Sequence, residues 1–368
     1  MPHKIKDVEV FSSVHRTENN TVYDSSYVMK LSGENVVRVT TDDGYEGYGM
    51  TFSDPIGEYV DKILKDEVIG RDILAYEDCW NAMYIQTRSS GRKGLALLAM
   101  SAIDIAIWDA RGKVLGQPVY KLLGGTKRKI PAYASIGFLS MPVEEMVEKS
   151  LEAIKDGYKT LKIKVGYDMG NNIRADYDRV LSAREAVGSE IELIIDANGI
   201  YDAASAIRLA TMVEELNISL FEEPTHADDI DGLARVRRMT KIPVASGENE
   251  YTKYGCRDLL RAEAVDVMQF DITRTGGFTE MMKVAALTQA WNIKLAPHFW
   301  PQFSAHILSA VSNGLYLETF PSDKNAPKNK QAIKNQPPVI NGYYELLEAP
   351  GLGLEFDIDY LTSFKKSY

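Results

Sequence analysis

The feature that most constrains the fold is a regular alternation of apolar and helix-like segments from residue 130 onward. Short apolar segments recur at intervals of roughly 20 to 30 residues, and each has the length and composition of a β-strand. They occupy residues 130–137, 160–166, 192–198, 219–225, 242–249, 265–271, 293–299 and 315–320. This recurrence predicts eight strands between residues 130 and 320.

The segments between these strands carry apolar residues at helical spacing. In residues 143–157, for example, Val143, Val147, Leu151 and Ile154 lie along one side. The other predicted helices occupy residues 175–188, 203–216, 232–240, 256–264, 278–291 and 304–313. Strands and helices in this order predict an α/β fold, a parallel barrel of the (β/α)7β type related to the TIM barrel. A doubly wound open sheet would give the same alternation, but the sequence "GGTKRK" precedes the first strand instead of a Gly-rich phosphate turn following it.

The first part of the chain has a different pattern. The stretch "VVRVTTDDGYEGYG" predicts two strands about a turn, and residues 93–116 predict a long helix. These elements predict an α+β capping domain over residues 1–129, followed by the barrel domain over 130–320. The remaining residues, 321–368, begin with a polar, Pro-containing loop and are expected to return to the capping domain.

Composition narrows the function classes. The chain has 368 residues, 45% of them hydrophobic and 26% charged, with a net charge of -10. This balance suits a soluble globular protein and argues against nucleic-acid binding. No apolar run approaches the roughly 20 residues of a membrane span, and no signal peptide is evident at the start. With two cysteines, we expect a cytoplasmic protein without a disulfide framework.

Three acidic residues follow successive predicted strands. Asp196, Glu222 and Glu248 stand 26 residues apart in each step, which is one strand–helix unit. In a parallel barrel the active site lies at the carboxyl ends of the strands, so these side chains are expected to meet there. Carboxylates without a cation would repel one another, and oxygen ligands suit a hard divalent ion such as magnesium, Mg²⁺. Separate helix-capping roles for each acid are the alternative.

The stretch "TLKIKVGYD" places Lys162 and Lys164 on one face of a strand, since side chains alternate. Across the barrel from a carboxylate–metal cluster, two lysines would no longer be isolated charges. We expect Lys162 and burial to lower the pKa of Lys164, which would let Lys164 act as a base. Alternatively, both lysines extend outward from an edge strand into solvent.

His298 follows the seventh predicted strand, and Asp271 follows the sixth. A carboxylate on one imidazole nitrogen fixes the tautomer and raises the pKa, which leaves the other nitrogen for proton transfer. Lysine and histidine would then flank the metal site from opposite sides. Two further polar residues, Asn198 and Glu318, are delivered by the third and eighth strands.

These residues together resemble a known family. The Lys-x-Lys strand, "DAN", "EEP", "GEN", the Asp before "TRTGG", the seventh-strand His and the eighth-strand Glu occur in order, and "SAIDIAIWDARGK" precedes them. In this the chain resembles the enolase superfamily, and within it the mandelate racemase subgroup. Relatives of the muconate cycloisomerase type carry lysine at the sixth strand, where this chain has Asp271.

The resemblance implies abstraction of the proton alpha to a carboxylate, giving an enediolate stabilised by Mg²⁺. It assigns the metal ligands to Asp196, Glu222 and Glu248. It assigns proton transfer to Lys164 and to His298 with Asp271, and an enediolate contact to Glu318. It implies that Lys162 contacts the substrate carboxylate and that Asn198 lies beside the metal. It also implies a homo-oligomer, either a dimer or an octamer.

Several reactions use such a site. Dehydration of a sugar acid to a 2-keto-3-deoxy acid is the expected reaction, with racemisation or epimerisation of a hydroxy acid and lactone cycloisomerisation as alternatives. A non-catalytic binder of sugar acids, or a Schiff-base lyase using a buried lysine, would belong to other classes. The partner is expected to be a small hydroxy-carboxylate, selected by the loop over residues 12–24, where His15 and Arg16 lie, and by Tyr133 on the first barrel strand.

Overall fold

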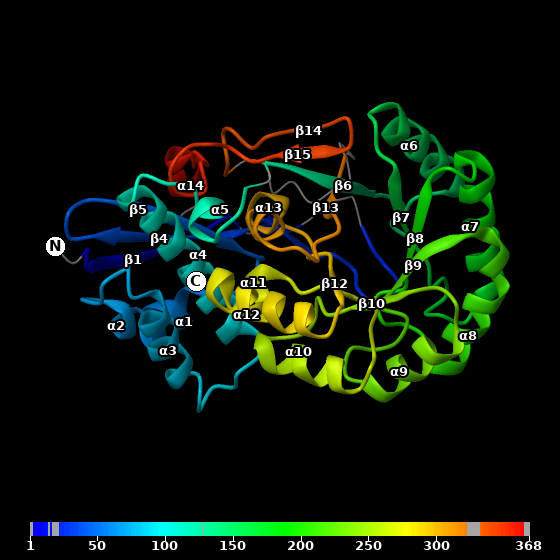
Figure 1. Ribbon diagram of the computed structural model, residues 1–368, viewed down its shortest axis with the longest axis horizontal. Coiled ribbons are helices and arrows are strands. Elements are labelled where there is room, and N and C mark those ends of the chain that lie inside the picture. Colours follow the sequence, from blue (N-terminus) through cyan, green and yellow to red (C-terminus); the bar gives the residue numbers. More distant parts are fainter. Residues whose placement is uncertain (1–2, 14, 17–21, 127, 322–331, 364–368) are drawn as a thin grey trace.

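The computed structural model describes residues 3–13, 15–16, 22–126, 128–321 and 332–363 (Figure 1). The barrel occupies the green-to-orange part of the chain, and the blue and cyan N-terminal elements lie beside it. No helix within these ranges is both long and apolar enough to cross a membrane.

Eight parallel strands form the barrel, and each matches one predicted segment. They are β6 (Lys129–Ser135), β7 (Thr160–Lys164), β8 (Glu192–Asp196), β9 (Ile218–Glu222), β10 (Val244–Ser246), β11 (Val267–Met268), β12 (Lys294–Leu295) and β13 (Leu317–Thr319). Neighbours in sequence pair in parallel from β6 to β12, and β13 pairs with β6. A parallel bridge between Leu295 and Gly314 joins β12 to the segment before β13, so the sheet closes on itself. The predicted modified TIM barrel is confirmed.

The predicted helices are also present. They are α6 (Val143–Lys155), α7 (Ile173–Val187), α8 (Ala203–Met212), α9 (Ile230–Met239), α10 (Thr252–Arg261), α12 (Gly277–Ala290) and α13 (Pro301–Ala310). Two short elements accompany them, the 3₁₀ helix η2 (Glu214–Leu216) and α11 (Ile272–Thr275). Three of the starts are capped by Asn172, Asp202 and Asp229, whose side chains accept N–H groups of the first turn. Such caps satisfy backbone donors that have no partner within the helix.

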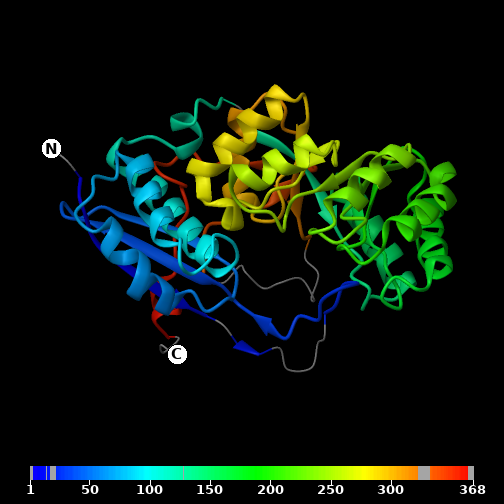
Figure 2. The same cartoon turned by 90° about the horizontal axis from the view of Figure 1, so that it is seen from below.

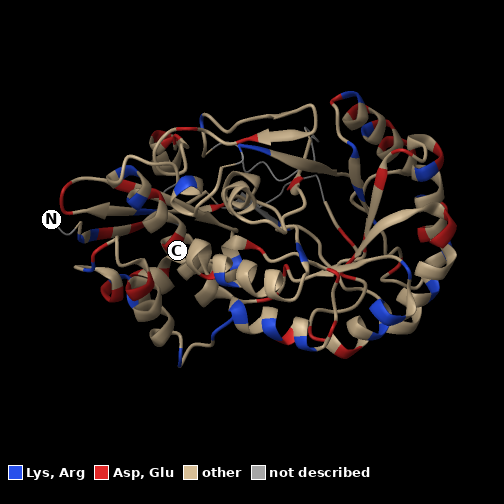
Figure 3. Ribbon diagram, viewed as in Figure 1, with Lys and Arg blue, Asp and Glu red and all other residues tan. Residues whose placement is uncertain are grey.

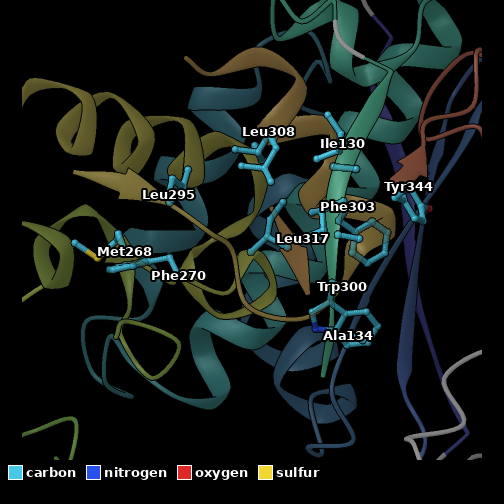
Figure 4. Close-up of a cluster of buried hydrophobic side chains, with 14 of the residues drawn as sticks. Ile130, Ala134, Met268, Phe270, Leu295, Trp300, Phe303, Leu308, Leu317 and Tyr344 are labelled. Atoms are coloured by element: carbon cyan, nitrogen blue, oxygen red, sulfur yellow. The ribbon is translucent and has the colours of Figure 1, made fainter. Parts of the chain in front are cut away.

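Alternation along the strands separates two cores. Residues facing the barrel interior form a small apolar cluster made of Tyr133, Ile194, Leu220, Ala245, Val267 and Ala296. Residues on the opposite faces, including Leu161 and Ile163, are fully buried under the surrounding helices. Figure 4 shows part of this larger cluster, in which Leu317 and Ile130 from two barrel strands lie near Phe303 and Leu308 of α13. The barrel is thus a filled core, and its polar side chains collect at one end.

The N-terminal domain is a three-stranded antiparallel sheet covered by helices. Its strands are β1 (Ile5–Ser12), β4 (Asn35–Thr41) and β5 (Glu46–Thr51), and its helical elements are α1 (Gly57–Tyr59), η1 (Val60–Leu64), α2 (Lys65–Val68), α3 (Tyr76–Gln86), α4 (Leu95–Val114) and α5 (Val119–Leu122). The two predicted strands and the long helix are present, and β1 is an additional strand. Gly47 and Gly49 let α4 pack directly on β5, because a Cβ there would lie 2.0 and 2.1 Å from carbonyl oxygens of α4.

The C-terminal segment contacts both parts. Strands β14 (Val339–Ile340) and β15 (Tyr343–Glu345) form a hairpin, and β15 pairs antiparallel with β6. Further along, Gly351 bridges Pro118, and helix α14 (Ile358–Ser363) lies against β1. The domain boundaries at residues 129 and 320 stay predictions.

The N-terminal region also reaches the barrel mouth. The short strands β2 (His15–Arg16) and β3 (Leu31–Ser32) pair with each other, and Figure 2 shows this blue segment running from the N-terminal domain toward the green part of the barrel. Ser25 lies between β2 and β3 in sequence, and its hydroxyl donates a hydrogen bond to the carbonyl of Ala197 at 2.5 Å. The segment therefore touches the barrel one residue after Asp196.

Candidate active site

The parallel register brings the first group of predicted residues together. Lys164 on β7 pairs with Asp196 on β8, and Asp196 pairs with Glu222 on β9. The three side chains therefore stand in one row across neighbouring strands. Lys164, Asp196 and Glu222 are all buried, with exposed fractions of at most 8%. Figure 3 shows that basic and acidic residues lie inside the ring of helices as well as along its outer side.

Both lysines face this row, and we call Lys162 and Lys164 the lysine flank. The ammonium of Lys162 lies 2.6 Å from Glu222 Oε1, 2.7 Å from Glu318 Oε1 and 3.3 Å from Asp196 Oδ2. The ammonium of Lys164 lies 2.5 Å from Asp196 Oδ2. The alternative of lysines extending outward into solvent is wrong, because Lys162 is 1% exposed and Lys164 is 8% exposed.

The expected direction of the Lys164 pKa is wrong. Burial does lower the pKa, and Lys162 lowers it further, but Asp196 together with Glu222 and Glu248 outweighs them. The net result is a Lys164 pKa above its usual value. The neighbouring lysine lowers the pKa as expected, but the carboxylates that the fold gathers around Lys164 have the larger effect.

Burial alone would raise the pKa values of Asp196 and Glu318, but the lysines hold both below their usual values. The lysines do not do so for every carboxyl of the site. Burial, Asp196 and Glu318 raise the pKa of Glu222 to about 8, although Lys162 opposes them. Glu223 is also fully buried, and burial and Glu248 raise its pKa strongly. Buried carboxylates with raised pKa values indicate a site that a further cation would stabilise.

The donor set fits a magnesium ion in the type of its ligand atoms. Asp196, Glu222 and Glu248 supply only oxygen atoms, from the ends of three adjacent strands, and Asn198 Oδ1 nearby is buried without a hydrogen-bond partner. Hard divalent ions prefer such oxygen ligands. In the described part of the chain no three His, Cys, Asp or Glu side chains are already arranged as a metal-binding group. The ammonium groups of the lysine flank lie against two of these carboxylates instead.

The predicted Asp–His pair is formed, and we call Asp271 and His298 the histidine flank. A backbone bridge sets the two residues side by side, and His298 Nδ1 lies 2.7 Å from Asp271 Oδ2. Asp271 Oδ1 accepts hydrogen bonds from the N–H and hydroxyl of Thr273, which hold the carboxylate at the start of α11. His298 Nε2 points toward Glu248, 3.4 Å from Oε2.

The pKa of His298 is raised above its ordinary value. Burial alone would lower it, but Glu248, Asp271 and Glu318 all favour the imidazolium. With Nδ1 held by Asp271, the other ring nitrogen, Nε2, is the one available to a substrate. The expected effect of a carboxylate partner on this histidine is therefore present.

The remaining predicted residues take different places. Glu318 joins the two flanks, because Oε1 lies 2.7 Å from the Lys162 ammonium and Oε2 lies 3.9 Å from His298 Nε2. Its Oε2 also accepts the backbone N–H of Phe299 at 3.0 Å. Asn198 donates its backbone N–H to Asp196 Oδ1 at 2.9 Å. Tyr133 lies in the interior cluster with its hydroxyl buried, and Lys162 stands 5.4 Å from its ring centroid.

His15 and Arg16 are described only as backbone in β2. Their side chains lie outside the described part of the structure, so their proposed contact with substrate stays a prediction.

Several residues at this site were not singled out from the sequence. Gln269 donates from Nε2 to Glu222 Oε2 at 2.8 Å, while its own Oε1 is buried without a partner. Phe138 lies 5.7 Å from the Lys164 ammonium, and Phe52 stacks 6.4 Å from the His298 ring. Gln269 stands two residues before Asp271, so strand alternation could have indicated it. Phe52 lies between β5 and α1, so its position beside His298 depends on how the N-terminal domain packs against the barrel.

Two family models match the chain. The model described as the mandelate racemase / muconate lactonizing enzyme N-terminal domain matches residues 8–124. The model described as enolase C-terminal domain-like matches residues 145–360. Together they span the N-terminal domain and the barrel with its C-terminal segment.

Individual proteins match over nearly the full length. Arabinonate dehydratase of Saccharolobus solfataricus is 33% identical over 325 residues, which cover 86% of each chain. D-galactarolactone cycloisomerase of Agrobacterium fabrum is 33% identical over 347 residues, which cover 90% of each. The crystal structure of a racemase from Streptomyces coelicolor A3(2) with bound magnesium is 29% identical, with a TM-score of 0.89 and 99% coverage of both chains.

Proposed function

We propose that this chain, which belongs to the mandelate racemase subgroup of the enolase superfamily, is a Mg²⁺-dependent enzyme. It removes the proton alpha to a carboxylate. The favoured reaction is dehydration of a sugar acid to a 2-keto-3-deoxy acid. Similarity to an arabinonate dehydratase over 86% of both chains supports this choice.

One observation carries the proposal. Two proton-transfer groups, Lys164 on β7 and His298 after β12, stand across the barrel from each other with acidic residues between them. A binding protein would need the acidic residues but has no use for two such groups. An alpha proton is weakly acidic, so its removal requires both a base and stabilisation of the resulting charge.

We assign the metal to Asp196, Glu222 and Glu248. When bound there, Mg²⁺ supplies positive charge that stabilises the negative charge developing on the substrate carboxylate. Lys162 and Glu318 complete the polar surroundings. Lys162 presents a buried ammonium to the substrate carboxylate. Burial alone would raise the pKa of Glu318, but Lys162 and His298 hold it below its usual value, so Glu318 supports the Lys162 ammonium as a carboxylate.

The proton steps belong to the two flanks. In a dehydration, one of Lys164 and His298 takes the alpha proton, and the other, in its protonated form, gives a proton to the departing β-hydroxyl, which leaves as water. The resulting enol ketonises to the 2-keto-3-deoxy acid. The raised pKa of His298 favours its imidazolium, which suits the role of acid.

Cycloisomerisation of a sugar lactone is a second candidate, because the Agrobacterium relative is as similar in sequence as the dehydratase. It would use the same bases, with a ring oxygen as the leaving group in place of hydroxide. The first shared step, alpha-proton removal, is the same in both reactions.

The test is a screen of aldonic acids, aldaric acids and their lactones with Mg²⁺ in deuterium oxide. Nuclear magnetic resonance would follow both the 2-keto product and deuterium at the alpha carbon. A dehydratase gives the 2-keto-3-deoxy acid, and a cycloisomerase consumes a lactone. Deuterium exchange without product indicates a racemase or epimerase. Tight binding of an acid with no exchange would contradict the proposal and indicate a non-catalytic binder.

A further inference from the structure

A buried arginine on α7 holds the backbone around Lys164. The side chain of Arg179 is 1% exposed. Its Nε donates to the carbonyl of Lys164 at 3.1 Å, and its Nη2 donates to the carbonyls of Gly137 and Phe138 at 2.9 and 3.1 Å. Its Nη1 donates to the carbonyl of Met141 at 3.2 Å and to the hydroxyl of Tyr167 at 2.7 Å.

These contacts use the full hydrogen-bonding capacity of the side chain. A guanidinium has five N–H donors in a rigid, planar fork, and here there are five acceptors. A lysine ammonium at the same place has three donors on a flexible stem, so it would leave buried carbonyls unpaired. The absence of a side chain at Gly137 allows this close approach. A Cβ there would lie 3.2 Å from Arg179 Nη2 and 2.8 Å from Met146, and the residue's φ of +72° also favours glycine.

The acceptors belong to two loops at the barrel mouth. Gly137, Phe138 and Met141 form the connection between β6 and α6, and Lys164 ends β7. The loops are also tied directly, because the backbone N–H of Lys164 donates to the carbonyl of Gly137 at 3.2 Å. Phe138 in turn sets its ring beside the Lys164 ammonium. Arg179 therefore lies behind the lysine flank and does not itself contact that ammonium.

We propose that Arg179 is the positioning residue for Lys164. By locking the β6–α6 loop to the end of β7, it holds the Lys164 ammonium between Asp196 and the ring of Phe138. The catalytic part of this inference rests on the proposed function, in which Lys164 transfers a proton. The histidine flank has its own supports at Asp271 and Thr273, so it does not depend on Arg179.

The same helix offers a matched control. Arg184 is also buried, at 9% exposure, and its guanidinium donates only to backbone carbonyls. Those acceptors are Gly188, Ile191, Leu216 and Asn217, which lie before β8 and β9 at the opposite end of the barrel. Arg184→Lys and Arg179→Lys therefore remove similar hydrogen bonds, keep the charge, and differ in distance from the site.

The experiment compares Arg179→Lys with Arg184→Lys by deuterium exchange at the alpha carbon of two substrate epimers. Lys164→Ala first identifies the epimer whose exchange needs Lys164. In Arg179→Lys we expect that exchange to fall on the order of 10²-fold, because small displacements of a catalytic group have effects of this size. Exchange of the His298-dependent epimer should stay within a few-fold, and Arg184→Lys should change neither. An equal loss for both epimers, or equal loss in both variants, would overturn the inference.

A second readout does not need activity. Backbone hydrogen exchange should accelerate over residues 136–141 and 164–167 in Arg179→Lys, and over residues 188–191 and 216–218 in Arg184→Lys. Unchanged protection at residues 136–141 in Arg179→Lys would overturn the inference even if no substrate is found. If the wild-type protein exchanges no acid at all, the proposed function fails, and this measurement still decides whether Arg179 holds the loop. Should Arg179→Lys not fold, Arg179→Gln, which keeps part of the donor set, takes its place.

Discussion

The two flanks of the site are built in different ways. The lysine flank lies on a regular strand, and its ammonium groups are held by carboxylates of the next strands in register. The histidine flank lies where β11 and β12 have already ended, and it is held by the start of α11 and by a bend at Phe299 and Trp300, both with positive φ. The lysine flank is thus set by strand geometry, and the histidine flank by loop conformation.

This difference has a chemical consequence. Lys162 and Lys164 sit among groups whose pKa values depend on one another, so changing one residue alters the others. His298 also interacts with Glu248 and Glu318, but its Nδ1 partner Asp271 lies outside the row of Lys164, Asp196 and Glu222. A substitution of Asp271 should therefore act mainly on His298, whereas a substitution within the row should alter several of its members.

The largest effect is expected from removing the metal, which serves both flanks. A chelator should reduce turnover to background, and added Mg²⁺ should restore it. Glu222→Gln should weaken Mg²⁺ binding by more than about 10²-fold, since even residues behind a metal ligand contribute about 10–100-fold. Titration calorimetry measures this, with Glu192→Gln at the other end of β8 as the control. Full turnover in excess chelator would remove the metal from the proposal.

The next effect separates the flanks directly. Lys164→Ala and His298→Asn should each reduce turnover by about 10²–10⁴-fold, the usual contribution of a positioned acid or base. The variant that keeps the abstracting base should still exchange the alpha proton for deuterium without releasing water. Mass spectrometry of recovered substrate distinguishes the two. Near wild-type turnover in both variants would show that the site is wrongly assigned.

Asp271→Asn should have a smaller effect, about 10²-fold or less, because it disturbs the orientation of His298 and leaves the imidazole in place. Asp271 is one of the groups that raise the His298 pKa above 6.5, so that pKa should fall in the variant. Protonated His298 stabilises the folded state fully below pH 6.5, and this contribution is lost as the pH rises through the folded-state pKa. Because the alkaline limb of the activity profile reports loss of the same proton, a lower His298 pKa should move that limb to lower pH in Asp271→Asn. An unmoved limb would assign it to another group.

The smallest effects are expected from substitution of the two aromatic residues beside the flanks, Phe138 and Phe52. Phe138→Leu removes the ring beside the Lys164 ammonium, and Phe52→Leu removes the ring that stacks near His298. A cation–π contact such as that of Phe138 contributes about 0.5–2 kcal/mol, which corresponds to a change of about twofold to about thirtyfold. The ring pair of Phe52 and His298 contributes about 0.5–1.5 kcal/mol. Epimer-specific exchange should show each substitution affecting its own flank. If either substitution slowed both epimers equally, the flanks would not be independent.

Much of the site was predictable because the barrel repeats. Once Asp196, Glu222 and Glu248 were placed at the ends of successive strands, the parallel arrangement required them to lie at the same end of the barrel. Alternation placed Lys162 with Lys164 on the interior face, where both are buried. These inferences needed only the strand period and the spacing of strand–helix units.

Other features depend on groups far apart in sequence. The pKa of Lys164 was predicted in the wrong direction, because its sign follows from how many carboxylates the barrel gathers around one ammonium. Phe52 reaches His298 from another domain, and Arg179 reaches the carbonyls of three loop residues. No local pattern encodes such contacts.

The order and spacing of residues in the chain were enough to predict the barrel, the order of its strands and the residue types at the carboxyl ends of the strands. Hydrophobic periodicity acts over a few residues and is visible in the chain as written. The partner of each charged group, and the side chains that hold the proposed catalytic groups in place, follow only from the folded arrangement. Electrostatic and hydrogen-bond energies depend on distance and burial in three dimensions, so Lys164, Asp196 and Arg179 acquire their partners only when the barrel closes.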